Sequence, residues 1–212
     1  MQENKLWNDL KNMFQDSKKD IHIYEGNYTI GNIETEKNGI NSNSVLGVII
    51  SFTSGICIDN WIRIVGQQCD NRNGISYYNS IEMKQMHLEL SDMLLVAYDV
   101  IGGVFAINRG KFAEGAKKVW YFAPDTLEWE CLEMSYSEFI AWVAQGDTDE
   151  FYNSMRWNQW QEDCKNIDFD KSFLIYPFLW SRECEINHAT KKVVPFSELM
   201  SINFEYVKTI NG

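Results

Sequence analysis

The chain has 212 residues, of which 45% are hydrophobic and 14% aromatic. This composition excludes a disordered chain and suits one large domain with a buried core. The 19 basic and 30 acidic residues give a formal net charge of −11, which argues against nucleic acid as a partner because phosphate binding needs a basic face. The sequence shows neither a signal-peptide pattern nor an apolar run of the ~20 residues that span a membrane. We therefore expect a cytoplasmic protein without a membrane partner.

The residues at the start of the chain predict one helix followed by a loop. Apolar residues recur at helical spacing in the range 3–13 and just beyond it, which predicts a short amphipathic helix over Glu3–Met13. Tyr28–Ser44 is rich in Gly, Asn and Glu, a composition typical of an exposed loop.

The next segment alternates β-branched and aromatic residues with turn residues. We expect strands at Val45–Phe52, Ile56–Ile58 and Trp61–Val65, followed by a polar turn at Gln67–Gly74. The mixed spacing of apolar residues in Ser80–Met93 fits either a helix or extended chain.

The range from Leu94 to Glu130 carries the clearest pattern, since short β-rich runs are separated by a glycine pair and a Pro-Asp-Thr turn. This pattern predicts an antiparallel meander. Gly102 and Gly103 are expected to supply a positive φ at a tight turn, and Pro124 is expected to begin the next turn.

Two further helices and a strand are expected after the meander. Ser135 or Ser137 can cap a helix that ends near Gly146, and Asp147 can cap a second helix that continues past Met155. A last strand is expected at Ile202–Ile210. The prediction is an α+β fold, with an antiparallel β-meander sheet and helices packed on one face. We expect a single domain over 1–212, comprising an N-terminal helix and loop (1–44), a core (45–180) and a C-terminal segment (181–212).

The meander also carries a family resemblance. Asp-Val-Ile-Gly-Gly-Val-Phe-Ala-Ile-Asn (99–108) and Tyr-Phe-Ala-Pro-Asp-Thr-Leu-Glu-Trp-Glu (121–130) resemble the core signature of a bacterial family, domain-of-unknown-function family 2625. The resemblance covers residues 45–180 and implies no activity. The order of strand, Gly-Gly, strand, hairpin and Ser-x-x-Phe helix is similar in layout to the SUKH superfamily, whose members include immunity proteins that neutralise bacterial toxins.

Known catalytic and metal-binding patterns are missing from the sequence. There is no Gly-x-Ser-x-Gly or His-Glu-x-x-His motif, and the cysteines form no Cys-x-x-Cys pair. We therefore predict no catalytic residue, no metal site, no cofactor and no disulfide framework. The scattered cysteines and histidines are Cys57, Cys69, Cys131, Cys164, Cys184, His22, His87 and His188.

The first functional hypothesis is a non-catalytic protein-binding module, such as an immunity-type neutraliser of a toxin. Its partner would be a basic protein that meets an acidic and aromatic surface. The residues expected at this surface are Trp120, Asp125, Glu128, Glu130 and Trp157. The oligomeric state is left open, and a purely structural or self-associating protein is a third hypothesis.

The second hypothesis is a small carboxylate-dependent hydrolase or a glycan-binding protein. It requires Asp99, Asp125 and the glutamates at 128 and 130 to converge beside an aromatic ring. The simpler interpretation is that the two glutamates alternate along a strand and form a solvated stripe. Asp99 lies inside an apolar strand and must be paired, and Arg63 or Arg156 is the expected partner.

Overall fold

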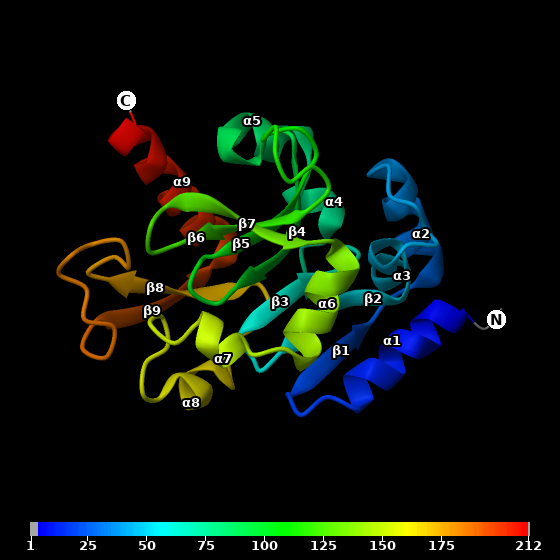
Figure 1. Cartoon of the computed structure of the whole chain (residues 1–212), viewed down its shortest axis with the longest axis horizontal. Helices are drawn as coiled ribbons and strands as arrows, with labels where there is room; N and C mark the ends of the chain where they lie inside the picture. Colours follow the sequence, from blue (N-terminus) through cyan, green and yellow to red (C-terminus); the bar gives the residue numbers. More distant parts are fainter. Residues whose placement is uncertain (1–3, 212) are drawn as a thin grey trace.

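The computed structural model describes residues 4–211, with side chains to residue 209. Within this range, seven strands form one sheet in which each strand pairs with the next along the chain (Figure 1), and every pair is antiparallel. The strands are β1 (Ile21–Glu25), β2 (Thr53–Ile58), β3 (Ile62–Val65), β4 (Met93–Asp99), β5 (Val104–Asn108), β6 (Val119–Ala123) and β7 (Glu128–Met134). A separate hairpin is formed by β8 (Lys171–Tyr176) and β9 (Thr190–Pro195). The predicted antiparallel α+β fold is confirmed.

Helices cover both faces of the sheet, beyond the single face that we expected. Phe139 of α6 packs on Phe105, and Phe204 of α9 packs on Phe122. Phe105 lies opposite Tyr121 in the ladder, so it faces the other way from Phe122, the next residue of β6. The helices are α1 (Lys5–Gln15), α2 (Tyr28–Lys37), α3 (Val45–Phe52), α4 (Ile75–Tyr78), α5 (Ile81–Met86), the 3-10 turn η1 (Leu88–Leu90), α6 (Tyr136–Gln145), α7 (Thr148–Phe151), α8 (Trp160–Cys164) and α9 (Phe196–Asn211).

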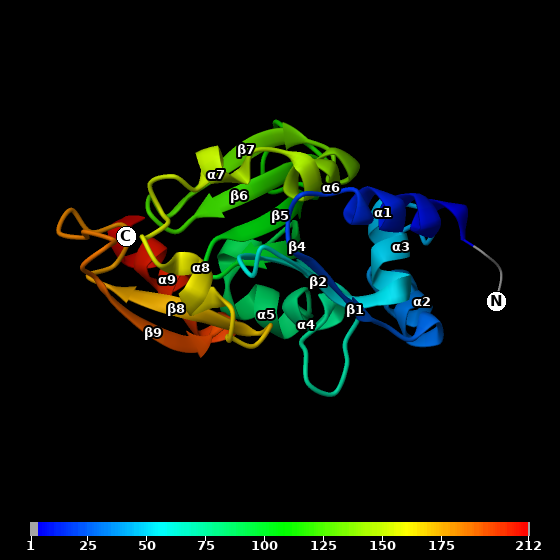
Figure 2. The ribbon, with the colours of Figure 1, turned by 90° about the horizontal axis from the view of Figure 1, so that it is seen from below.

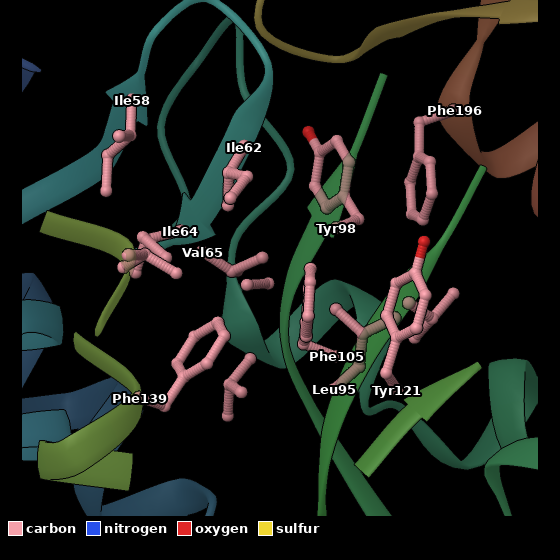
Figure 3. Close-up of a cluster of buried hydrophobic side chains, with 14 of the residues drawn as sticks. Ile58, Ile62, Ile64, Val65, Leu95, Tyr98, Phe105, Tyr121, Phe139 and Phe196 are labelled. Carbon is pink, nitrogen blue, oxygen red and sulfur yellow. The ribbon is translucent and has the colours of Figure 1, made fainter. Parts of the chain in front are cut away.

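The core lies against the central strands and is rich in aromatic rings. Figure 3 shows Phe105, Tyr121 and Phe139 grouped between the sheet and α6, and Tyr98 beside Phe196. The rings of Tyr98 and Phe196 stack with centroids 3.8 Å apart. Such buried rings remove large apolar areas from water, and this burial is the main contribution to stability.

Two expectations for the first third of the chain are wrong. Tyr28–Ser44 is not an exposed loop, because α2 fills most of it and is capped by the side chain of Asn27. Val45–Phe52 is the helix α3 and not a strand, capped by Ser44. An apolar run of eight residues fits a helix that is buried all round as well as a strand, and periodicity cannot separate the two. The predicted N-terminal helix is confirmed as α1, although Glu3 lies outside the described residues.

Two expectations for the last third are also wrong. Ile202–Ile210 belongs to the long helix α9 and is not a strand. The second predicted helix is only the single turn α7, because the chain leaves helical geometry after Phe151 and α8 begins at Trp160. The cap that starts α6 is confirmed: Ser135 and Glu138 form a capping box, and Gly146 follows the last residue.

The glycine pair between β4 and β5 has two different roles. Gly102 has a φ of +94°, as the turn requires. Gly103 is required by space instead, since a Cβ atom would lie 2.2 Å from the Asp99 carboxylate and 2.3 Å from the Tyr121 hydroxyl. Pro124 begins the β6–β7 connection as predicted, and this connection is closed by a 2.8 Å hydrogen bond from the Leu127 N–H to the Ala123 carbonyl.

Candidate functional site

A polar cleft of about 1170 Å³ opens at one end of the sheet. Its walls come from the α1–β1 connection, the β2–β3 turn, the α6–α7 connection and the region of α8, which lie together at the lower side of Figure 1. Six carboxylates and three lysines line it, together with Trp160. The charged residues are Asp16, Asp20, Asp59, Asp147, Asp149, Glu162, Lys18, Lys19 and Lys165.

Hydrogen bonds join Asp20, which precedes β1, to the β2–β3 turn that contains Asp59. Asp59 and Asn60 both have left-handed backbone conformations, with φ of 51° and 52°, which Asp and Asn tolerate in tight turns. Asp59 Oδ1 accepts the N–H of Asp20 at 2.9 Å, and the Asn60 side-chain amide donates to Asp20 Oδ2 at 3.3 Å. Burial raises the pKa of Asp59 because it penalises the charged form. These two hydrogen bonds use Asp59 Oδ1 and Asp20 Oδ2, and they do not involve Asp59 Oδ2 or Asp20 Oδ1.

Lys19 joins the α1–β1 connection to the end of α6. Its ammonium donates to the Val143 carbonyl at 3.1 Å and to the Thr148 hydroxyl at 2.8 Å. A cation at the C-terminal end of a helix also interacts favourably with the helix dipole. Partial burial lowers the pKa of this amine. Attraction to the cleft carboxylates Asp59, Asp149 and Asp147 opposes this shift, so Lys19 offsets part of the negative charge of the cleft.

Arg156 fastens the α7–α8 wall of the cleft to the sheet. Its guanidinium carbon lies 4.1 Å from the ring centre of Trp160, 5.0 Å from that of Trp61 and 5.2 Å from that of Tyr152. The guanidinium also forms an ion pair with Asp149, whose side chain is 85% exposed. Cation–π contacts of this kind stabilise a desolvated guanidinium, so this wall is held in place without a ligand.

The predicted binding residues lie outside this cleft and do not form one surface. Trp157 is only 5% exposed and packs against Trp61, so it belongs to the core. Trp120 is half-buried and stacks on Phe112 with ring centroids 4.0 Å apart. The three predicted acids all belong to the β6–β7 hairpin, and Asp125 is half-buried in its turn. Glu128 and Glu130 are exposed on β7, as the solvated-stripe interpretation predicted.

Asp99 is fully buried. The prediction that an arginine pairs with it is wrong. Its Oδ2 accepts the hydroxyls of Tyr121 at 2.8 Å and Tyr152 at 3.0 Å. Its Oδ1 accepts the backbone N–H groups of Ile101 at 3.1 Å and Gly103 at 2.8 Å. Burial raises the pKa of this carboxyl, and the four donors oppose that shift. The arrangement satisfies a buried acid and gives it a structural role.

The two arginines expected near Asp99 have other contacts. Arg156 belongs to the cleft wall, and Arg63 is buried with its Nη1 donating to the Cys57 thiol at 3.0 Å. Among the described residues, no group of three or more His, Cys, Asp or Glu side chains is arranged to hold a metal ion. Within the same part of the chain, no helix is both long and apolar enough to cross a membrane.

Sequence reasoning missed the cleft because its acids occupy positions that predict local structural roles. Asp16 follows the last residue of α1, Asp59 lies in a hairpin turn, and Asp147 caps α7 by accepting the N–H of Glu150. Turns and caps favour Asp in any protein. The only available signal was the number of acids at segment ends, and it does not show that these ends meet.

Comparison with known proteins assigns the family. The sequence model of the family described as "Protein of unknown function DUF2625" matches residues 1–199. The chain belongs to the DUF2625 family. The match extends beyond the 45–180 range of the resemblance. No solved structure matches this DUF2625 protein.

Two curated relatives of this DUF2625 protein are similar over nearly their full lengths. The uncharacterised protein YbfG of Escherichia coli (strain K12) is 32% identical over 210 residues, which cover 98% of this chain and 94% of YbfG. An uncharacterised protein of Haemophilus influenzae (strain ATCC 51907 / DSM 11121 / KW20 / Rd) is 30% identical over 205 residues, which cover 95% and 90% of the two chains. Neither name states an activity.

Proposed function

We propose that this DUF2625 protein is a non-catalytic binding module whose cleft holds a basic segment of a partner protein. The observation that carries the proposal is the charge of the cleft, where six carboxylates face three lysines. Two ion pairs cancel part of this charge, since Glu162 pairs with Lys165 at 2.6 Å and Asp149 pairs with Arg156. The four other carboxylates still outnumber Lys18 and Lys19 by two. The remaining negative charge favours a cationic ligand and speeds its approach.

The size of the cleft and the support of its walls favour a segment of polypeptide chain as the ligand. Its volume of about 1170 Å³ exceeds the ~300–1000 Å³ that is usual for pockets that enclose a small molecule. The walls are supported by internal contacts of Lys19 and Arg156, so little ordering is needed before a partner binds. Preorganisation of this kind lowers the entropic cost of association.

We extend the proposal to an immunity-type role, in which the partner is a basic toxin such as a nuclease. A nuclease needs a basic face to bind phosphates, and an acidic protein that covers this face would block its substrate. The net charge of −11 supports this role, and we propose on the layout of the sequence alone that the chain is related to the SUKH superfamily.

Affinity purification of the tagged protein from its own host tests the proposal. We expect a stoichiometric basic partner that is released as the salt concentration rises, because salt screens exposed charges. The Asp20→Asn/Asp59→Asn variant keeps the acceptor oxygens but removes two charges, and it should lose the partner. A control variant, Glu36→Gln/Glu183→Gln, removes two exposed charges outside the cleft and should retain it. Recovery of the wild-type protein alone would contradict the proposal.

A carboxylate-dependent hydrolase or glycan-binding protein is the second candidate. It is favoured by Asp59, which lines the same cleft as the aromatic ring of Trp160. Burial raises the pKa of Asp59, as in a general acid. The acids first expected in this role do not converge, since Asp99 is buried and Glu128 is exposed on β7. Turnover of a glycoside panel that Asp59→Asn abolishes would support the hydrolase, and no turnover by the wild-type protein would reject it. Failure of the wild-type protein to bind any member of a glycan panel would reject the glycan-binding protein.

A further inference from the structure

The last strand of the sheet leaves one of its edges unpaired. Within residues 4–211, β7 pairs only with β6, and Figure 2 shows it as the outermost strand on that side. In an antiparallel strand, every second residue directs its N–H and C=O groups away from the neighbouring strand. The outer edge of β7 therefore presents backbone groups that only another extended chain can bind in register.

This edge is short and firmly held. The regular ladder with β6 runs from Glu128 to Cys131, because the register shifts beyond it and Glu133 adopts a φ of +56°. Trp129 anchors the strand, since its indole N–H donates to Glu89 at 3.1 Å and its ring lies 5.5 Å from that of Phe122. The edge is thus formed in advance and does not need a partner to become ordered.

The side chains of β7 determine which strand can bind. Glu128 and Glu130 share one face and are both exposed. A second copy paired antiparallel through β7 would place glutamates against glutamates, and like charges across a strand pair are destabilising. A strand with lysine or arginine on that face would instead form cross-strand ion pairs. The charge of β7 therefore disfavours self-association and favours a basic strand.

We propose that the outer edge of β7 binds an extended, basic segment of a protein partner as an eighth strand, with Lys or Arg side chains opposite Glu128 and Glu130. None of the residues that line the cleft belongs to β7. The edge of β7 is therefore a second surface, separate from the cleft. The proposal for the edge and the proposal for the cleft can each be refuted without refuting the other.

Short synthetic peptides test the proposal. The probe alternates lysine with threonine, and its control has the same sequence with alternate backbone amides N-methylated, which keeps the charge and removes strand hydrogen bonds. We expect the probe to slow amide hydrogen exchange in residues 128–131 and the methylated peptide to lose this effect. Equal protection by both peptides would overturn the proposal, because binding would then be electrostatic only.

Charge reversal provides the matched variants. Glu128→Lys/Glu130→Lys should weaken probe binding by about five- to tenfold, as two exposed ion pairs predict. Glu36→Lys/Glu183→Lys changes the net charge equally at exposed positions outside β7 and should leave binding unchanged.

Two other outcomes would overturn the proposal. Protection that appears around Asp20 and Asp59, and not in β7, would place the peptide in the cleft and support only the function proposed above. A dimer in sedimentation with protected β7 amides would make a second copy the occupant.

Discussion

Replacing Gly103 with alanine tests how tightly the core is packed around Asp99. The added Cβ would lie 2.2 Å from Asp99 Oδ2 and 2.3 Å from the Tyr121 hydroxyl, and no atoms approach so closely without displacement. Overpacking of this kind costs about 1–3 kcal/mol, and displacing a hydrogen bond to a buried carboxylate adds about 1.5–3 kcal/mol. We expect Gly103→Ala to lower the free energy of unfolding by about 2.5–6 kcal/mol.

Thermal unfolding followed by circular dichroism measures this effect. In a protein of this size, 1 kcal/mol corresponds to roughly 2–4 °C in Tm, so a loss of about 10 °C is expected. A double-mutant cycle with Tyr121→Phe locates the cause, since that change removes one of the two crowded oxygens. Gly103→Ala should then cost at least about 1 kcal/mol less than in the wild-type background. A Tm for Gly103→Ala within about 2 °C of the wild-type value would refute the reasoning.

Three further predictions concern pH, a buried acid and exposed charges. Burial lowers the pKa of His87 from 6.5, so its neutral form stabilises the fold above that pH and the contribution is lost as the pH falls below it. Urea unfolding at about pH 5 and about pH 8 should show a smaller pH dependence for His87→Gln than for the wild type. Glu34 is buried and accepts two backbone N–H groups, so Glu34→Ala should lower the urea midpoint by the equivalent of about 2 kcal/mol; an unchanged midpoint would show that these bonds do not matter. Glu128→Gln and Glu130→Gln should each change the free energy of unfolding by no more than about 0.5 kcal/mol, so Tm should stay nearly the same. Strong destabilisation would mean that the side chains are buried.

Local patterns predicted the elements that local chemistry determines. The meander from β4 to β7 follows from short β-rich runs that are interrupted by Gly102-Gly103 and by Pro124, since these residues favour turns whatever surrounds them. The start of α6 follows from Ser135, whose cap is completed within one helical turn.

Tertiary contacts decided the elements that the sequence mispredicted. Tyr28–Ser44 was too polar to suggest structure, yet α2 buries Glu34 against backbone N–H groups of Gln68 and Ser76. The apolar run of α3 fits a strand or a helix equally well until its surroundings bury all its sides. Propensity and periodicity describe neighbours along the chain, and these contacts are between residues far apart in it.

The sequence by itself determined the α+β class, the order of the central strands and the excess of negative charge. Only the tertiary structure decided where that charge is concentrated and what satisfies the buried acid. Asp99 is bound by hydroxyls 22 and 53 residues further along the chain, and the cleft collects acids from Asp16 to Glu162. Such sites depend on which turns and helix ends meet in space, and that is settled by the packing of the whole core rather than by any local run of residues.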